Sequence, residues 1–324
     1  KEIVLILENF ELTFVNLSGF KKLNGSQILR ENITYILNNL KSYIDKTESK
    51  KTILHIFNSK FYLDNKNVDN LPIGLFGDFY SHELSCILIN SNDHKNLNNI
   101  FDKVNLKIKK ILIKSFINGA NISNNYGTTD TFFHIKISKN DTKIFYFENN
   151  SLKFEQSFKF GVDIVIKDIS KITSLNIDLI QTILNKIEKF DGISEEDLVE
   201  NFFFKDKVYK KIKKRLIYEI ALARIKEISE IMLFKNINFV HYNKISKNIF
   251  LEIDPKLQFR CLNEIYETVF SMNKNYNLNF INFSSESMLD TAHKLVHFGW
   301  KKEAIAVTQP KKSLIVRFFD TIFG

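Results

Sequence analysis

The order of strand-like and helix-like segments constrains the fold of this chain more than any other feature of its sequence. Apolar residues recur at helical spacing in some segments, and they alternate or cluster at strand spacing in others. Strands are predicted over residues 2–7, 11–17, 52–57, 83–89, 108–113, 131–137, 143–148, 152–158, 248–253 and 279–283. Helices are predicted over residues 26–45, 93–104, 162–172, 177–188, 194–203, 206–233, 256–272 and 286–298. This alternation predicts a mixed α/β (α+β) chain.

Composition narrows the class further. A length of 324 residues favours about two domains, and 44% hydrophobic with 26% charged residues is ordinary globular material. A net charge of +9 favours a protein that binds nucleic acid or an anionic membrane. Abundant Lys, Asn and Ile are typical of an AT-rich genome, however, so part of the Lys excess reflects that bias and the charge argument is weakened. Cys86 and Cys261 lie far apart without metal-ligand spacing, which favours a reducing cytoplasm. The chain opens on Lys1, so we expect a segment upstream.

The C-terminal residues 313–324 form an amphipathic pattern. Wound as a helix at about 100° per residue, they place one set of apolar side chains on a single arc: Leu314, Ile315, Val316, Phe318, Phe319, Ile322 and Phe323. The run is far shorter than the roughly 20 apolar residues that span a bilayer, and a basic linker over 301–312 precedes it. The pattern therefore predicts a helix lying in a membrane interface, with docking on the protein's own core as the alternative.

Four local stretches follow one another in the chain: the turn 71–77 (LPIGLFG), the helix and strand 98–112, the stretch 160–169 (FGVDIVIKDI) and the stretch 223–228 (ARIKEI). In this order they resemble the bacterial cell-division family FtsA of the actin and Hsp70 superfamily. The basic linker and the amphipathic end complete the pattern. The resemblance implies an actin-like two-lobed, ribonuclease H-like fold with a small inserted α+β subdomain.

The resemblance also implies domain boundaries, which follow in chain order. They are an inserted α+β subdomain over 1–90, the closing part of the first lobe over 91–123, a second lobe over 124–300 with a helical outer subdomain over about 162–245, the linker 301–312 and the membrane-targeting helix 313–324. The family's N-terminal portion, with its first phosphate loop, would lie before Lys1.

One motif bears on chemistry: Gly127, Thr128, Thr129 and Asp130 resemble the second phosphate loop of actin-like ATPases. Such a turn offers main-chain amides to phosphate oxygens, and a preceding Asp orients Mg²⁺-bound water. Here Ser123 takes the place of that Asp, Tyr126 replaces a glycine, and the region 251–256, matching the adenosine loop, contains no glycine. We therefore expect a degenerate site without catalysis, with weak ATP and Mg²⁺ binding or an ordinary β-turn as the open alternatives.

The resemblance implies a cell-division adaptor. It would bind the acidic C-terminal peptide of FtsZ through Arg224, Glu227 and Arg215, with Arg224 expected to be exposed. It would also associate with itself into filaments and tether FtsZ to anionic lipids at the cytoplasmic face of the inner membrane, at the division site. The alternatives are an active actin-like ATPase, a pilus-assembly relative and, last, a nucleic-acid binder built on the basic run 205–215. His293 and His297 are spaced like a metal pair, but no third ligand follows, so we expect no metal site.

Overall fold

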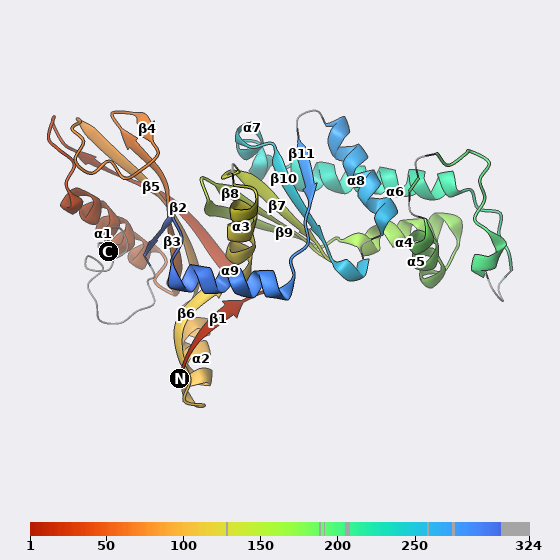
Figure 1. Ribbon diagram of the computed structural model, residues 1–324, viewed down its shortest axis with the longest axis horizontal. Helices are drawn as coiled ribbons and strands as arrows, with labels where there is room; N and C mark the ends of the chain where they lie inside the picture. Colours follow the sequence, from red (N-terminus) through yellow and green to blue (C-terminus); the bar gives the residue numbers. More distant parts are fainter. Residues whose placement is uncertain are drawn as a thin grey trace. The chain divides into compact units, whose positions relative to one another are not determined.

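The structure is a computed structural model that describes residues 1–127, 129–187, 189–190, 192–204, 208–257, 259–273 and 276–305. Contacts divide the chain into two compact units (Figure 1). Unit 1 contains residues 1–130, residues 147–154 and the chain from Phe283, and unit 2 contains residues 131–146 and 155–282. The predicted α/β class is confirmed, because strands and helices alternate through both units.

Unit 1 is built on a five-stranded sheet. Its strand order is β12-β3-β5-β2, with β4 beside β3, and these strands pair in antiparallel fashion. The strands are β2 (Leu12–Lys22), β3 (Lys51–Leu63), β4 (Lys66–Val68), β5 (Phe79–Asn90) and β12 (Glu303–Ile305). The last of these corrects the predicted linker over 301–312, because residues 303–305 form a strand on β3. Residues 306–312 lie outside the described residues.

Helix α1 (Arg30–Thr47) covers one face of this sheet because its apolar residues recur on one side. Ile36 and Ile44 are buried there, and Ile44 packs in a cluster with Leu84 and Cys86 of β5. The close approach requires Gly19 on β2, since a Cβ at that position would lie 2.5 Å from Cγ2 of Ile36. The predicted helix over 26–45 is confirmed, with its start shifted to Arg30.

The remaining elements of unit 1 flank a second, two-stranded sheet. Strand β1 (Glu2–Leu7) pairs in parallel with β6 (Lys107–Ile113), and not with β2. The range 1–90 therefore does not hold together as one sheet. The helices of this part are α2 (Ser91–Asp102), α3 (Lys114–Asn125) and α9 (Ser285–His297). Helix α3 was not predicted; it packs against α9, and Asn121 Nδ2 donates to Thr291 Oγ1 at 2.9 Å.

Unit 2 centres on a five-stranded sheet of order β11-β10-β7-β8-β9. Its strands are β7 (Phe132–Ile137), β8 (Thr142–Glu148), β9 (Ser151–Phe158), β10 (Asn248–Ile253) and β11 (Asn277–Phe280), and the ends of β8 and β9 in residues 147–154 belong to unit 1. Strand β10 is parallel to both β7 and β11. The predicted meander over 131–158 is confirmed, as are the two later strands.

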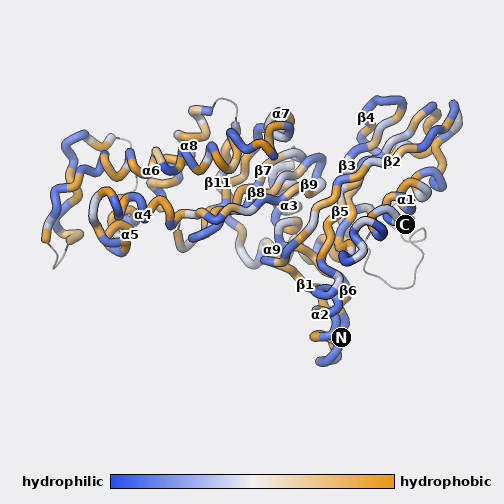
Figure 2. The backbone as a smooth tube through the Cα atoms, turned by 180° about the vertical axis from the view of Figure 1, so that it is seen from behind, coloured by the Kyte–Doolittle hydropathy of each residue, from blue (hydrophilic) through white to orange (hydrophobic). Residues whose placement is uncertain are grey.

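The long segment between β9 and β10 is mostly helical, and α8 lies beyond β10. The α-helices are α4 (Val162–Thr173), α5 (Ile177–Lys186), α6 (Lys214–Ser229), α7 (Tyr242–Ile245) and α8 (Arg260–Met272). Short helical turns also occur: η1 (Asn201–Phe204), η2 (Glu230–Phe234, a π-turn), η3 (Ile237–Phe239) and η4 (Pro255–Leu257). Hydrophobic and hydrophilic stretches alternate along α4 and α6 (Figure 2), as expected for helices with one buried face.

Two helix predictions in this segment are wrong. The stretch 194–203 forms a turn, in which the Ser194 amide donates to Asp197 and the Ser194 hydroxyl accepts from the Glu196 amide, followed only by η1. The helix predicted from 206 begins at Lys214, because the backbone of Lys213 is extended and this residue forms a β-bridge with Leu198. Local polar contacts and this bridge override the helical spacing of the apolar residues.

Candidate functional site

The predicted phosphate loop is a tight turn between α3 and β7. The Thr129 amide donates to the carbonyl of Tyr126 at 2.7 Å, and the Asp130 carbonyl accepts from the Asn150 amide at 2.7 Å. Gly127 has open space on its side-chain side, since a Cβ there would meet nothing within 4 Å. Thr128 lies outside the described residues. The loop is therefore tied by its main chain to the β8–β9 turn within unit 1.

The side chain that replaces the expected Asp is occupied within the protein. Ser123 is buried, and its hydroxyl donates to Oδ1 of Asn150, with the Thr129 carbonyl 3.4 Å away. A hydroxyl held in this way cannot supply the negative charge that orients Mg²⁺-bound water. Tyr126 also brings a large side chain to the turn, where a phosphate loop needs bare main chain.

The adenosine-loop region offers no better fit. Leu251 and Ile253 are buried residues of the strand β10. The next residue is Asp254, whose amide donates to the Ile137 carbonyl at 3.0 Å, and Pro255 follows it. Proline removes an amide donor, and no glycine opens the backbone there. Within the described ranges no group of three or more His, Cys, Asp or Glu side chains could hold a metal ion. These residues do not fit a nucleotide with its magnesium ion.

Arg224, predicted to be exposed, is a half-buried member of an ion-pair network. It lies on α6, where its Nε donates to Oδ2 of Asp168 on α4 and its Nη1 donates to Oε2 of Glu227 at 2.6 Å. Only 27% of its side chain is exposed. The expectation of a freely exposed Arg224 is therefore wrong, because the carboxylates of Asp168 and Glu227 already accept hydrogen bonds from its guanidinium.

Three other basic residues of this region are paired as well. Arg215 donates through Nε to Glu219 at 3.1 Å, and its guanidinium lies 5.1 Å from the ring centre of Tyr218. Lys213 pairs with Glu196 at 3.0 Å. Lys214 pairs with Glu200 at 2.5 Å. The structure brings Arg224 and Glu227 together, but it places Arg215 in a separate pair with Glu219, nine residues before Arg224 on α6. The local carboxylates reduce the positive field of this surface.

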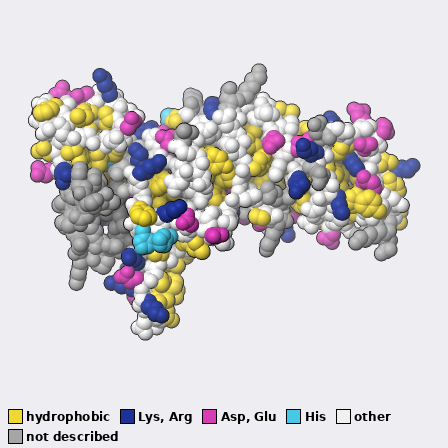
Figure 3. Space-filling view, viewed as in Figure 1, with side chains coloured by type: hydrophobic (Ala, Val, Ile, Leu, Met, Phe, Trp, Pro, Cys, Tyr) yellow, Lys and Arg dark blue, Asp and Glu magenta, His cyan; other side chains and the backbone are white. Residues whose placement is uncertain are grey.

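The predicted membrane residues Leu314, Ile315, Phe318, Phe319, Ile322 and Phe323 lie outside the described residues. Among the residues that the structure does describe, no helix is long and apolar enough to cross a membrane. The His293 and His297 rings are exposed side by side on α9, with ring centres 4.2 Å apart, and form a histidine patch visible in Figure 3.

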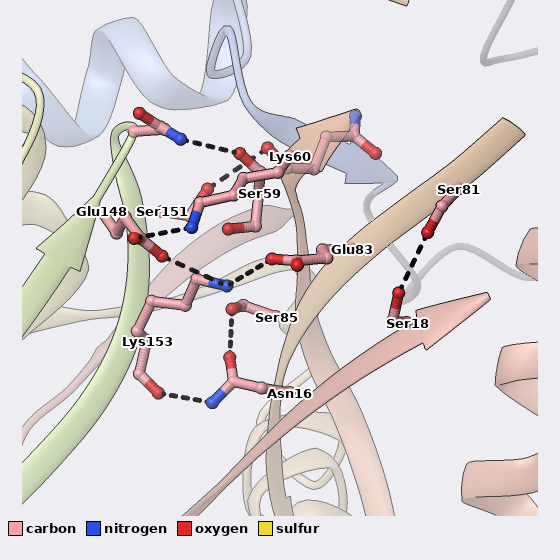
Figure 4. A network of polar contacts seen from close by, with 12 residues as sticks. Asn16, Ser18, Ser59, Lys60, Ser81, Glu83, Ser85, Glu148, Ser151 and Lys153 are labelled. Carbon is pink, nitrogen blue, oxygen red and sulfur yellow. Dashed lines mark hydrogen bonds and ion pairs between the residues drawn. The ribbon is translucent and has the colours of Figure 1, made fainter. Parts of the chain in front are cut away.

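A buried polar network in unit 1 was not predicted (Figure 4). Lys153 lies near both Glu148 and Glu83, at 3.7 and 3.9 Å, and Glu148 also pairs with Lys60 at 2.9 Å. Burial lowers the pKa of Lys153, against the opposing effect of the two carboxylates. Asn16 Nδ2 donates to the Lys153 carbonyl at 3.1 Å. The network holds the β8–β9 turn against the sheet of β2, β5 and β3. No sequence motif marks it, because its members come from five separate strands.

A second unpredicted cluster holds the strand β12. The carboxylate of Glu303, 5% exposed, accepts from Nδ1 of His55 at 2.8 Å and from Nζ of Lys110 at 2.9 Å. Burial acts to raise the pKa of Glu303, but His55 and Lys110 outweigh it and lower that pKa. The indole of Trp300 donates to the Asn150 carbonyl at 2.8 Å. The last described residues are thus fixed to unit 1 rather than free.

No protein-family model and no curated protein sequence matches this chain. Among solved structures, it is similar to a PilM-PilN type IV pilus biogenesis complex (TM-score 0.45, 9% identity, 91% of this chain and 76% of that one). It is also similar to MreB5 of Spiroplasma citri bound to AMPPNP (TM-score 0.42, 14% identity, 64% of this chain and 65% of that one). A third similar structure is Ta0583, an archaeal actin homolog (TM-score 0.36, 13% identity, 58% of each chain). The chain thus spans 65% and 58% of the latter two.

The chain has the α/β fold predicted from its sequence, and its structural neighbours include an actin homolog. At these scores and identities the likenesses say nothing about what this chain binds or does.

Proposed function

We propose that this chain is a non-catalytic adaptor of the FtsA type, which binds the C-terminal peptide of FtsZ and tethers FtsZ filaments to the cytoplasmic face of the membrane. The observation that carries the proposal is the sequence of residues 313–324, an amphipathic run behind a basic linker. That run is short, so a single copy binds lipid reversibly. Many copies along one filament hold it through their effective concentration.

The nucleotide site supports an adaptor over an ATPase. Ser123 is held by Asn150, Tyr126 stands beside the loop glycine, and Pro255 follows β10 where an open loop is needed. An enzyme of this kind depends on charge and main-chain donors placed around the phosphates, whereas Ser123 supplies no charge and Pro255 supplies no amide donor. We therefore expect a calorimetric titration with ATP and Mg²⁺ to give no heat of binding.

The residues proposed to contact the acidic peptide are Arg215 and Arg224, which lie nine residues apart and therefore on opposite sides of α6. Because each guanidinium already donates to a carboxylate of the protein, a peptide carboxylate would bind by exchange with Glu219 or Glu227. Such exchange gives modest affinity and strong salt dependence, since the net gain is the difference between two similar ion pairs.

The test is a titration of a labelled FtsZ C-terminal peptide at two salt concentrations. Arg215→Glu should lower affinity at least about tenfold, roughly 1.4 kcal/mol, because it replaces a donor with a like charge. Lys46→Glu on α1, exposed in unit 1, is the matched control and should bind as the wild type does. Equal binding by all three proteins would move the peptide site elsewhere, and binding only to a pilus-assembly peptide would favour that alternative.

A further inference from the structure

The two edges of the sheet in unit 1 are treated differently. The outer edge of β3 is covered by the chain itself, through β4 at one end and β12 at the other. At the opposite edge, β2 pairs only with β5, and no other strand of the described ranges lies beside it (Figure 1). An uncovered strand presents a row of main-chain donors and acceptors ready for pairing with another strand.

Strand β2 carries none of the devices that usually protect such an edge. It is 11 residues long, and its register with β5 runs without a bulge from Leu12 to Lys22. Its sequence contains no proline, and its charges stand only at the ends, with Glu11 just before it and Lys21 and Lys22 at its close. Long, regular edges without inward charges or proline are the ones that accept a partner strand.

The sequence of β2 is complementary to itself when reversed. In an antiparallel pair of identical strands that continues one sheet, opposite residues lie on the same face. With Asn16 opposite Asn16 of the second copy, Glu11 falls opposite Lys21 and Leu12 falls opposite Phe20. Each pairing occurs twice because the arrangement is two-fold symmetric. Glu11 and Lys21 thus carry opposite charges where they meet. Val15 also falls opposite Leu17, whereas Phe14 faces Ser18.

The side chains at the end of β2 are disposed for this use. Phe20 is 72% exposed, an unusual position for a large aromatic ring unless something covers it. The Lys21 ammonium lies 4.3 Å from the ring centre of Tyr35, which holds it beside the strand end. Glu11 is exposed and has no ion-pair partner in the described part of the chain.

We propose that two copies of this chain associate through antiparallel pairing of β2 with β2, in the register that places Glu11 opposite Lys21. The pairing extends the five-stranded sheet of unit 1 into a continuous ten-stranded sheet. It depends on neither FtsZ nor lipid, so it stands or falls separately from the proposed function.

A mixed cross-linking experiment tests the register directly. Two full-length variants are made, Glu11→Cys and Lys21→Cys, in a chain whose own Cys86 and Cys261 are buried. Paired strands bring opposite Cβ atoms to about 5 Å, within disulfide reach after a small adjustment. Under mild oxidation, the mixture should give a disulfide-linked dimer. Neither variant alone should do so, because identical positions are roughly 30 Å apart in this register.

Charge reversal tests the same pairing without cysteine. Glu11→Lys and Lys21→Glu should each weaken dimerisation about tenfold in sedimentation equilibrium, because two like-charged pairs replace two opposite ones. The double variant should restore it. Asp45→Lys and Lys46→Glu, exposed on α1, are the matched controls and should leave the dimer unchanged.

The outcomes separate clearly. A wild-type chain that stays monomeric at all accessible concentrations would overturn the proposal. The chain would also stay monomeric if its own C-terminal segment occupied the edge of β2. A disulfide-linked dimer of the Glu11→Cys variant alone would overturn the register, since it requires position 11 of one copy to lie opposite position 11 of the other. A melting temperature measured for each variant identifies any loss of dimer that follows from unfolding.

Discussion

Arg224 of α6 donates through Nε to the Asp168 carboxylate of α4, across 56 residues of sequence. Both residues belong to stretches identified in the sequence analysis, 160–169 and 223–228. The ion pair joins the two helices of unit 2 that lie beside each other in Figure 1. A residue predicted to bind a partner thus also has a structural role, which changes what its replacement should do.

Arg224→Glu should lower the free energy of unfolding by about 2 kcal/mol, because it removes charged hydrogen bonds and leaves Asp168 facing a like charge. The exchanged pair Asp168→Arg with Arg224→Asp should recover most of that loss in chemical denaturation. If Arg224 also contacts the acidic peptide, the exchanged protein should fold well and still bind peptide weakly. Full recovery of both properties would assign Arg224 a structural role only.

Glu148 belongs to the network of Figure 4, whereas Glu155 lies outside it, and we expect their replacement to affect stability differently. Glu148→Gln should cost about 3 kcal/mol of stability, because it removes the carboxylate shared by Lys60 and the buried Lys153. Glu155→Gln should cost far less. Burial raises the pKa of Glu155 despite its pairing with Lys143, so its ionised form is poorly stabilised in the folded protein. Equal losses in urea unfolding would contradict this account of the network.

His82 predicts how stability depends on acid. Its ring is buried and donates through Nε2 to Asn58, and burial lowers the pKa of His82 to about 3. The unfolded chain titrates near 6.5, so it binds the proton that the folded chain rejects. Stability therefore falls as pH falls from about 6.5 towards 3, by as much as about 1.4 kcal/mol per pH unit.

The check is the slope of unfolding free energy against pH for three proteins. His82→Gln should flatten the slope between pH 6 and pH 4, whatever it does to the absolute stability. His293→Gln, on the exposed face of α9, should leave the slope as in the wild type. An unchanged slope in the His82 variant would mean that other groups cause the acid sensitivity.

Hydrophobic spacing sufficed to predict most of the sheet strands and α1, α4, α5 and α9, because each buries one regular face. Helix α3 escaped prediction because it is rich in Asn and carries Gly119 at its centre. That glycine is required by packing, since a Cβ there would lie 2.0 Å from Cζ of Phe147, a residue distant in sequence. The start of α6 was misplaced because Lys213 bridges to Leu198, which spacing cannot reveal.

The site was less predictable than the fold. The sequence identifies which residues are absent from a phosphate loop, such as the Asp replaced by Ser123, because absence is local information. It does not identify ion-pair partners, which come from other elements: Asp168 for Arg224, and His55 and Lys110 for Glu303. Because the sequence does not show these partners, it predicts a free surface charge at Arg224 and a linker over residues 303–305.

The most direct test of the adaptor is sedimentation of FtsZ filaments with anionic vesicles, in the presence of the wild-type chain or of the variant Phe318→Glu with Phe319→Glu. Two charges on the apolar arc need desolvation that a short interfacial helix cannot offset. We predict that the wild type brings FtsZ to the vesicles and that the variant, with an unchanged melting temperature, leaves FtsZ in solution. A variant that recruits FtsZ as well as the wild type, or that melts much earlier, would contradict the membrane role of residues 313–324.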